Sequence, residues 1–157
     1  MRALSGGPWD LAVCLGNSLS LLTTPEDLAA TFRAVRSSLA PGGRFCFQIL
    51  NYLSGSSQKP RHRIVHRTAG NTEVTAVKNL VPHKGLTYLS LAFYSRSGEE
   101  CTSLSETAVL KNWTKNDVVK ALGETGFAIQ GIYGGFDSSA YSPEQSPDIV
   151  CVALRES

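Results

Sequence analysis

Two short, mainly apolar runs stand out near the start of the chain: residues 11–15 are apolar throughout, and residues 44–50 are apolar apart from Arg44 and Gln48 and are interpreted as a second buried strand. A continuous run of this length is typical of a strand buried on both faces of a parallel sheet. The first run is followed directly by Gly16-Asn17-Ser18. This polar turn would lie at the carboxyl end of its strand, where open α/β sheets hold their ligands.

The segment between the two runs is patterned as a helix. Thr24 is a capping residue, Pro25 follows at the first helical position, and Asp27 lies three residues after the cap. Apolar residues then repeat at helical spacing at Leu28, Phe32, Val35 and Leu39. The Pro-Gly-Gly run at 41–43 is expected to end this helix. Together the elements predict one right-handed βαβ unit.

From residue 61 the pattern changes to alternating apolar and polar positions, which is typical of half-buried antiparallel strands. A Ser/Gly-rich loop over residues 52–60 leads into this region. We predict a four-stranded meander with strands at 61–67, 72–81, 86–94 and 102–110.

A second helix is predicted after Trp113, because Thr114 and Asp117 have the spacing of a capping box. Gly126 is a suitable left-handed residue to end it. Two further strands are predicted at 127–133 and 148–154. Residues 1–8 are Gly-rich and are predicted to form a loop that leads into the first strand.

Composition narrows the function classes. A net charge of +2 lacks the dense basic face of a nucleic-acid-binding protein, and no apolar run is long enough to span a bilayer. Three of the four cysteines lie in apolar strand patterns, as buried thiols do in a reducing compartment. With no signal peptide pattern, we predict a cytoplasmic protein that binds neither nucleic acid nor membrane.

Three segments carry a resemblance to a known family: DLAVCLGNSLSLL, LAPGGRFCFQILNY and YGGFDSSAYSPEQSPDIVCVALR. They resemble the C-terminal portion of class I S-adenosylmethionine-dependent methyltransferases, above all the glycine and amino-sugar N-methyltransferases. The resemblance implies an α/β fold: the C-terminal half of a Rossmann-like sheet with an inserted antiparallel β lid. Residues 1–57 and 111–157 would form the partial core, and residues 58–110 the lid.

The implied activity is methyl transfer from S-adenosyl-L-methionine to the nitrogen or oxygen of a small-molecule acceptor. A full domain of this family also has a strand–GxGxG–helix unit and a second strand ending in an acidic residue, and the chain contains no GxGxG. We therefore expect the chain alone to be inactive and to pair with a missing N-terminal half or form a homo-oligomer. The alternative is a non-catalytic binding or oligomerisation module derived from a methyltransferase.

By the resemblance, Leu15, Gly16, Asn17 and Ser18 contact the cofactor. Gly16 allows close approach of the backbone to a ligand, and Asn17 and Ser18 offer hydrogen-bond donors and acceptors. The alternative interpretation is a plain strand-ending turn built from common turn residues.

Asn51 and Tyr52 leave the second strand at the same sheet edge, and the resemblance makes them catalytic candidates, with Tyr52 orienting the acceptor. A tyrosine packed beneath the lid explains Tyr52 equally well. Relatives with an amino-acid substrate have an arginine where this chain has Leu50, which argues for another small amine or hydroxyl acceptor. Tyr133 and Asp137 are candidate substrate-binding residues, although Asp137 also suits a turn.

The one charge cluster, KPRHRIVHR at residues 59–67, alternates arginines with His62, Ile64 and His66. It suits a phosphate-bearing substrate or, more commonly, a charged edge strand that blocks sheet-to-sheet pairing. The two histidines have no third ligand at useful spacing, so no metal site is predicted. GNSLS lacks the second glycine of a serine-hydrolase nucleophile elbow.

Overall fold

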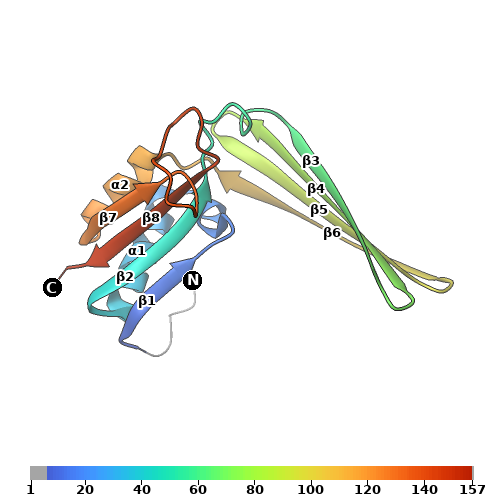
Figure 1. The fold of residues 1–157 in the computed structure, drawn as a ribbon, viewed down its shortest axis with the longest axis horizontal. Helices are drawn as coiled ribbons and strands as arrows, with labels where there is room; N and C mark the ends of the chain where they lie inside the picture. The colour runs from blue at the N-terminus through green and yellow to red at the C-terminus, as the bar shows by residue number, and fades with distance from the viewer. Residues whose placement is uncertain (1–6, 157) are drawn as a thin grey trace.

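The computed structural model describes residues 7–156, and its strands form two separate four-stranded sheets. The predicted leading loop therefore lies, over residues 1–6, outside the described residues. The core sheet consists of β1 (Trp9–Cys14), β2 (Leu39–Leu50), β7 (Phe127–Tyr133) and β8 (Asp148–Arg155). The outer sheet consists of β3 (Arg61–Ala69), β4 (Thr72–His83), β5 (Leu86–Ser97) and β6 (Glu100–Lys111). The outer sheet extends away from the core sheet as an arm (Figure 1).

The core sheet has the strand order β1-β2-β8-β7. β1 and β2 are parallel, as the βαβ unit predicts, whereas β8 is antiparallel to both β2 and β7. The last strand of the chain is thus inserted beside β2. The mixed α/β fold with an inserted antiparallel sheet is confirmed.

Helices α1 (Pro25–Ser38) and α2 (Lys115–Glu124) begin at the predicted caps. The Thr24 hydroxyl oxygen accepts a hydrogen bond from the Asp27 backbone N–H at 3.1 Å. Thr114 and Asp117 form the complete capping box. These bonds satisfy backbone donors that the first helical turn leaves without partners.

The end of α1 differs from the prediction. The helix stops at Ser38, and Leu39 is already extended with φ −84° and ψ 151°. The Pro-Gly-Gly run therefore lies inside β2 and does not end the helix. Gly42, with φ 78°, lies beside a register shift between β1 and β2, so its conformational freedom serves an irregularity in the strand.

The core lies between the two helices and one face of the core sheet. Phe32 of α1 packs against Phe45 and Phe47 of β2, each pair with ring centroids 5.7 Å apart. The three rings are fully or almost fully buried. Trp113 joins this core, and its indole N–H donates to the carbonyl oxygens of Leu19 and Leu22. These two hydrogen bonds hold the start of α2 against the short 3₁₀ helix η1 (Ser18–Leu21).

The prediction that the first strand is buried on both faces is wrong for the described chain. β1 is at the edge of the core sheet, and Leu11 and Val13 are 56% and 55% exposed. An apolar run indicates only that a strand is suited to being covered on both faces. Among residues 7–156, however, the helices cover one face only (Figure 1).

The outer sheet has the four predicted strands in the order β3-β4-β5-β6, each longer than predicted. Its expected half-burial is wrong along most of its length. Ile64 on β3 and Leu104 on β6 are 63% and 59% exposed, although they lie on opposite faces of the sheet by register. Only the end next to the core sheet is buried, at Leu80, Thr87 and Leu110.

Candidate functional site

The turn after β1 is held in place by a glutamine of the neighbouring strand. Gly16 and Asn17 have positive φ angles of 73° and 65°, a conformation that suits glycine and asparagine. Their two backbone N–H groups both donate to Gln48 Oε1 on β2, at 2.9 and 3.1 Å. Gln48 Nε2 in turn donates to Asp148 Oδ1 on β8 at 2.6 Å. Three strands are thus connected through one buried side chain.

The Asn17 side chain joins the ends of β1 and β2. Its Oδ1 accepts from the Leu50 backbone N–H at 2.9 Å and from the Ser20 hydroxyl at 2.8 Å. Its Nδ2 donates to the Tyr52 hydroxyl oxygen at 2.8 Å. The turn at Gly16 and the exit of β2 therefore lie at the same sheet edge, because the two strands are parallel.

A cleft of about 290 Å³ opens at this edge, between the core sheet and the outer sheet. Gly16, Asn17 and Ser18 line its core side together with Gln48 and Leu50. Its other wall comes from the outer sheet, at Lys78, Leu80, Leu89 and Leu110. The cleft thus combines an apolar wall with a polar rim, as small-molecule sites commonly do.

Leu15, the fourth predicted cofactor residue, does not line this cleft. It is exposed, and its carbonyl oxygen accepts a hydrogen bond from the Ser18 hydroxyl at 2.8 Å. That bond closes the turn and occupies the Ser18 hydroxyl hydrogen. The cofactor role of these residues stays a prediction.

Asn51 is fully buried and its polar atoms are all engaged within the protein. Nδ2 donates to the carbonyl oxygens of Pro143 and Ser146, both at 2.8 Å. Oδ1 accepts from the Leu53 backbone N–H and from the Tyr141 hydroxyl. Burial and the nearby Glu144 carboxylate raise the pKa of Tyr141, which keeps that hydroxyl a donor. This arrangement favours a positioning role for Asn51, fastening the loop before β8 to the end of β2.

Tyr52 lies between two cavities. Its hydroxyl meets Asn17, which lines the cleft, while its ring lines a second cavity of about 350 Å³ with Leu53, His83 and Asn112. The side chain is 6% exposed. Tyr52 is therefore packed beneath the outer sheet with its hydroxyl hydrogen-bonded at the sheet edge, and its catalytic role stays a prediction.

Comparison with known proteins gives no match by sequence but many matches by structure. No protein-family model matches the sequence, and no curated protein matches it. Solved structures do match. A methyltransferase from Clostridium acetobutylicum that depends on S-adenosylmethionine aligns with TM-score 0.78 and 18% identity, over 98% of this chain and 61% of its own.

Two more matches are sugar-modifying enzymes. An amino pentose methyltransferase from Micromonospora echinaspora, solved with S-adenosylmethionine bound, aligns with TM-score 0.72 and 16% identity over 96% of this chain and 59% of its own. A sugar N-methyltransferase from Streptoalloteichus aligns with TM-score 0.74 and 16% identity over 98% and 58%. The chain has a methyltransferase fold. It spans about 60% of the length of the structures that it matches.

Within this methyltransferase fold, neither of the predicted substrate residues lines the cleft. Tyr133 ends β7, and its ring lies over Gly131 of the same strand, so close that a Cβ there would meet the Tyr133 hydroxyl. Asp137 is fully exposed and accepts from the Ser139 backbone N–H at 3.1 Å. Hydrogen bonds from Ser139 lower the pKa of Asp137. The turn-forming alternative therefore accounts for Asp137, and the substrate role of both residues stays a prediction.

Sequence reasoning missed two residues of the cleft. Gln48 is buried in an otherwise apolar strand, and that single polar residue was the available signal, since buried polar groups need partners. Lys78 carries a weaker signal, a lone cation between Ala76 and Leu80 on one face of β4. Its proximity to Gly16 depends on how the outer sheet meets the core sheet, which no local pattern contains.

No group of three or more His, Cys, Asp or Glu side chains among residues 7–156 is arranged to hold a metal ion. None of the helices in this part of the chain is long and apolar enough to cross a membrane.

Proposed function

We propose that this chain provides the acceptor-binding side of a methyltransferase that uses S-adenosylmethionine and methylates the nitrogen or oxygen of a small molecule. The observation that supports the proposal best is the Asn17 bridge, which joins the ends of two parallel strands at the rim of a cleft. Ligands of open α/β sheets bind at this position. The matched structures add the fold, and one of them was solved with S-adenosylmethionine bound.

The turn fits one side of a cofactor site. A Cβ built on Gly16 meets nothing within 4 Å, so the space beside this backbone is open to a ligand. When bound, S-adenosylmethionine supplies a sulfonium methyl group that the lone pair of the acceptor atom attacks in line. Such a reaction needs alignment and exclusion of water more than a reactive side chain.

The residues at the cleft suit that need. Asn17 holds Tyr52 by donating to its hydroxyl oxygen, which leaves the Tyr52 O–H to donate toward the acceptor molecule and orient it. Leu80, Leu89 and Leu110 close one side of the cleft with apolar surface, which keeps water from the reacting atoms. Tyr52 thus acts as an orienting group, with Asn17 as its positioning residue.

We further propose that the cofactor site is completed by a segment outside this sequence. The chain has no GxGxG turn, and the outer edge of β1 has no paired strand among the described residues. The completing segment would pair with that edge and supply the phosphate-binding type of glycine turn found in nucleotide-binding sheets. An in-frame GxGxG within about 100 residues upstream of Met1, a domain's worth with this chain, would supply it.

Calorimetry with S-adenosylhomocysteine tests both parts of the proposal. This chain alone should bind the ligand weakly or not at all, whereas the longer polypeptide, or the complex with the completing segment, should bind it at micromolar concentration. Asn17→Ala in the longer form should weaken binding by about tenfold, roughly 1.4 kcal/mol, because the turn loses the three side-chain hydrogen bonds that hold it in place beside the ligand. Gln130→Ala, at an exposed position on β7, is the control. Micromolar binding by this chain alone would contradict the need for a completing segment.

A binding or oligomerisation module is the second candidate function. The observation in its favour is the apolar edge strand β1, whose Leu11 and Val13 are exposed, since such edges invite association. Light scattering during size-exclusion chromatography should then show a mass that rises with concentration. A monomer at every concentration tested argues against this candidate.

A further inference from the structure

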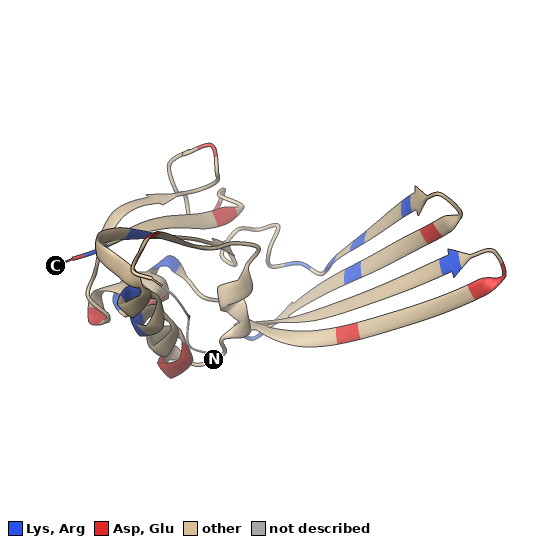
Figure 2. Ribbon diagram, turned by 90° about the horizontal axis from the view of Figure 1, so that it is seen from below, with Lys and Arg blue, Asp and Glu red and all other residues tan. Residues whose placement is uncertain are grey.

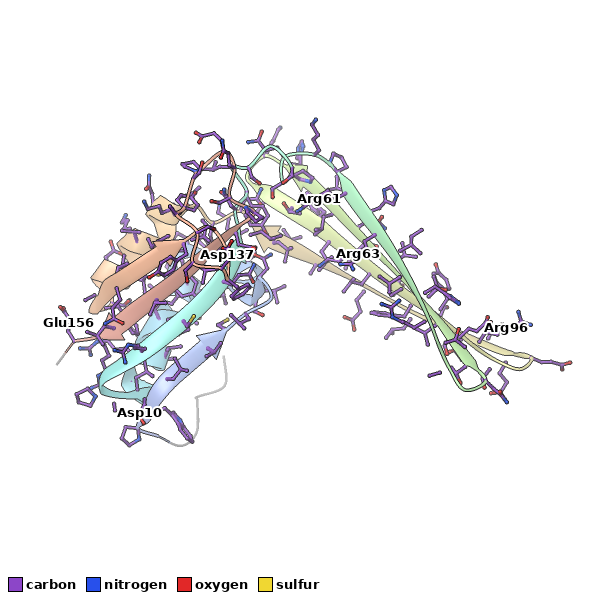
Figure 3. All side chains as sticks on the ribbon, in the orientation of Figure 1. Asp10, Arg61, Arg63, Arg96, Asp137 and Glu156 are labelled. Atoms are coloured by element: carbon purple, nitrogen blue, oxygen red, sulfur yellow. The ribbon has the colours of Figure 1, made fainter. Side chains whose placement is uncertain are left out.

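The strand register gathers cations on one face of the outer sheet. Arg63 on β3 lies directly opposite Lys78 on β4, and Arg61 lies opposite Leu80. Directly opposed residues of an antiparallel pair share a face, with Cβ atoms about 5 Å apart. Figure 2 shows basic positions along the half of the outer sheet that adjoins the core sheet. Arg61 and Arg63 lie on the side that faces the core sheet (Figure 3).

Edge protection does not explain this arrangement. A charged edge strand accounts for Arg61 and Arg63, because β3 is at the sheet edge. Lys78, however, lies on β4, an internal strand. A like-charge pair directly opposed across two strands is destabilising. The Arg63–Lys78 pair therefore lowers the stability of the fold, and a bound anion would offset that loss.

The cations have no counter-ion within the described residues. The one ion pair found there joins Lys120 and Glu124 on α2, far from this sheet. The nearest acid on the same face by register is Glu106, two strands from Lys78 and so about 10 Å away. Arg61 Nε is buried without a hydrogen-bond partner, although buried polar atoms ordinarily have one.

The same face forms the wall of the cleft. Lys78 and Leu80 line it opposite Gly16, Asn17 and Ser18. A molecule in the cleft would therefore meet the sheet edge on one side and Lys78 on the other, with Arg63 directly beside Lys78 on the same face of the outer sheet. The Asp148 carboxylate on the core sheet is engaged by a hydrogen bond from Gln48 and is not a counter-ion in an ion pair with these cations.

We propose that Arg61, Arg63 and Lys78 form an oxyanion subsite that binds a phosphate or carboxylate group of the methyl acceptor. Guanidinium groups bind either anion through two parallel N–H bonds, and lysine adds a point charge. The subsite would hold the acceptor's anionic end on the outer sheet while its reacting atom lies beside the Gly16–Ser18 turn. This substrate class rests on the proposed function, whereas the subsite itself does not.

Nuclear magnetic resonance of the ¹⁵N-labelled chain tests the subsite directly, with inorganic phosphate and acetate as probes. Both should give saturable amide shifts confined to residues 61–63 and 78–80. Tighter binding of phosphate would assign a phosphoryl group to the acceptor, and equal or tighter binding of acetate a carboxylate. Arg63→Gln and Lys78→Gln should each raise the dissociation constant about tenfold, the loss of one charge-assisted bond.

Arg96→Gln is the matched control, because it removes the same charge from the opposite face of the same sheet, near its free end. It should change the dissociation constant less than about twofold, as a charge beyond the screening length does. Shifts spread over the whole sheet, or equal losses in all three variants, would overturn the proposal. Arg63 and Lys78 are exposed, so their variants should keep the amide dispersion of the parent. Failure of the calorimetric test above would contradict the proposed function and leave this result standing.

Discussion

The two sheets of this protein differ in how much of their side-chain surface is buried. The core sheet lies against two capped helices and buries Phe45, Phe47 and Ile149 almost completely. The outer sheet has equally regular pairing along all four strands, yet exposes apolar and charged side chains on both faces. Regular hydrogen bonding is therefore common to both, and burial is what separates them. Because burial dominates stability, the core sheet should contribute most of the free energy of unfolding. The outer sheet, with its exposed side chains, should contribute mainly to ligand binding.

Paired substitutions of one residue type give the largest test of this difference. Phe47→Ala in the core sheet should lower the free energy of unfolding by about 3–5 kcal/mol, because it leaves a cavity among packed rings. Phe93→Ala in the outer sheet, where the ring is 40% exposed, should cost about 1 kcal/mol or less. Urea denaturation followed by tryptophan fluorescence measures both. Equal losses would show that the outer sheet is a second folding core.

The two walls of the cleft should differ in the same way. Asn17→Gly keeps the left-handed backbone but removes three hydrogen bonds, and should cost about 1–3 kcal/mol. Asn17→Ala should cost roughly 1 kcal/mol more, because alanine resists the positive φ. Lys78→Ala, on the other wall, should change stability by about 0.5 kcal/mol or less, as exposed positions do. A large loss on Lys78→Ala would mean that its charge serves the fold.

Thiol reactivity gives the smallest and most local contrast. Burial, and to a lesser degree the neighbouring Cys46, raises the pKa of Cys151 to about 12, whereas Cys101 on the outer sheet is exposed. At pH 8 iodoacetamide should therefore label Cys101 first, with Cys151 protected until the chain unfolds. The raised pKa favours folding while the thiol is protonated, so this contribution is present below pH 9 and is lost as pH rises toward 12. Early labelling of Cys151, read by peptide mass spectrometry, would contradict a tightly covered core sheet.

Local chemistry in the sequence was enough to predict most elements. Thr24, Thr114 and Asp117 predicted the starts of both helices, because capping depends only on residues within one turn. Alternation announced the four outer strands, and the sequence of the Gly16–Ser18 turn indicated the edge at which the cleft opens. The same patterns misplaced the end of α1 and overstated the burial of β1, because helix ends and strand coverage depend on which neighbours a segment meets.

The amino-acid sequence by itself determined most of the secondary structure, the order of the elements and the polar turn at the end of β1. Only the tertiary structure decided which residues share the cleft. Gln48 reaches Gly16 across 32 positions of chain, and Lys78 reaches the same cleft from a different sheet. Periodicity encodes which face of an element a side chain occupies. Which other element that face meets is set by long-range packing, and for this reason the outer-sheet wall of the cleft became visible only in the folded chain.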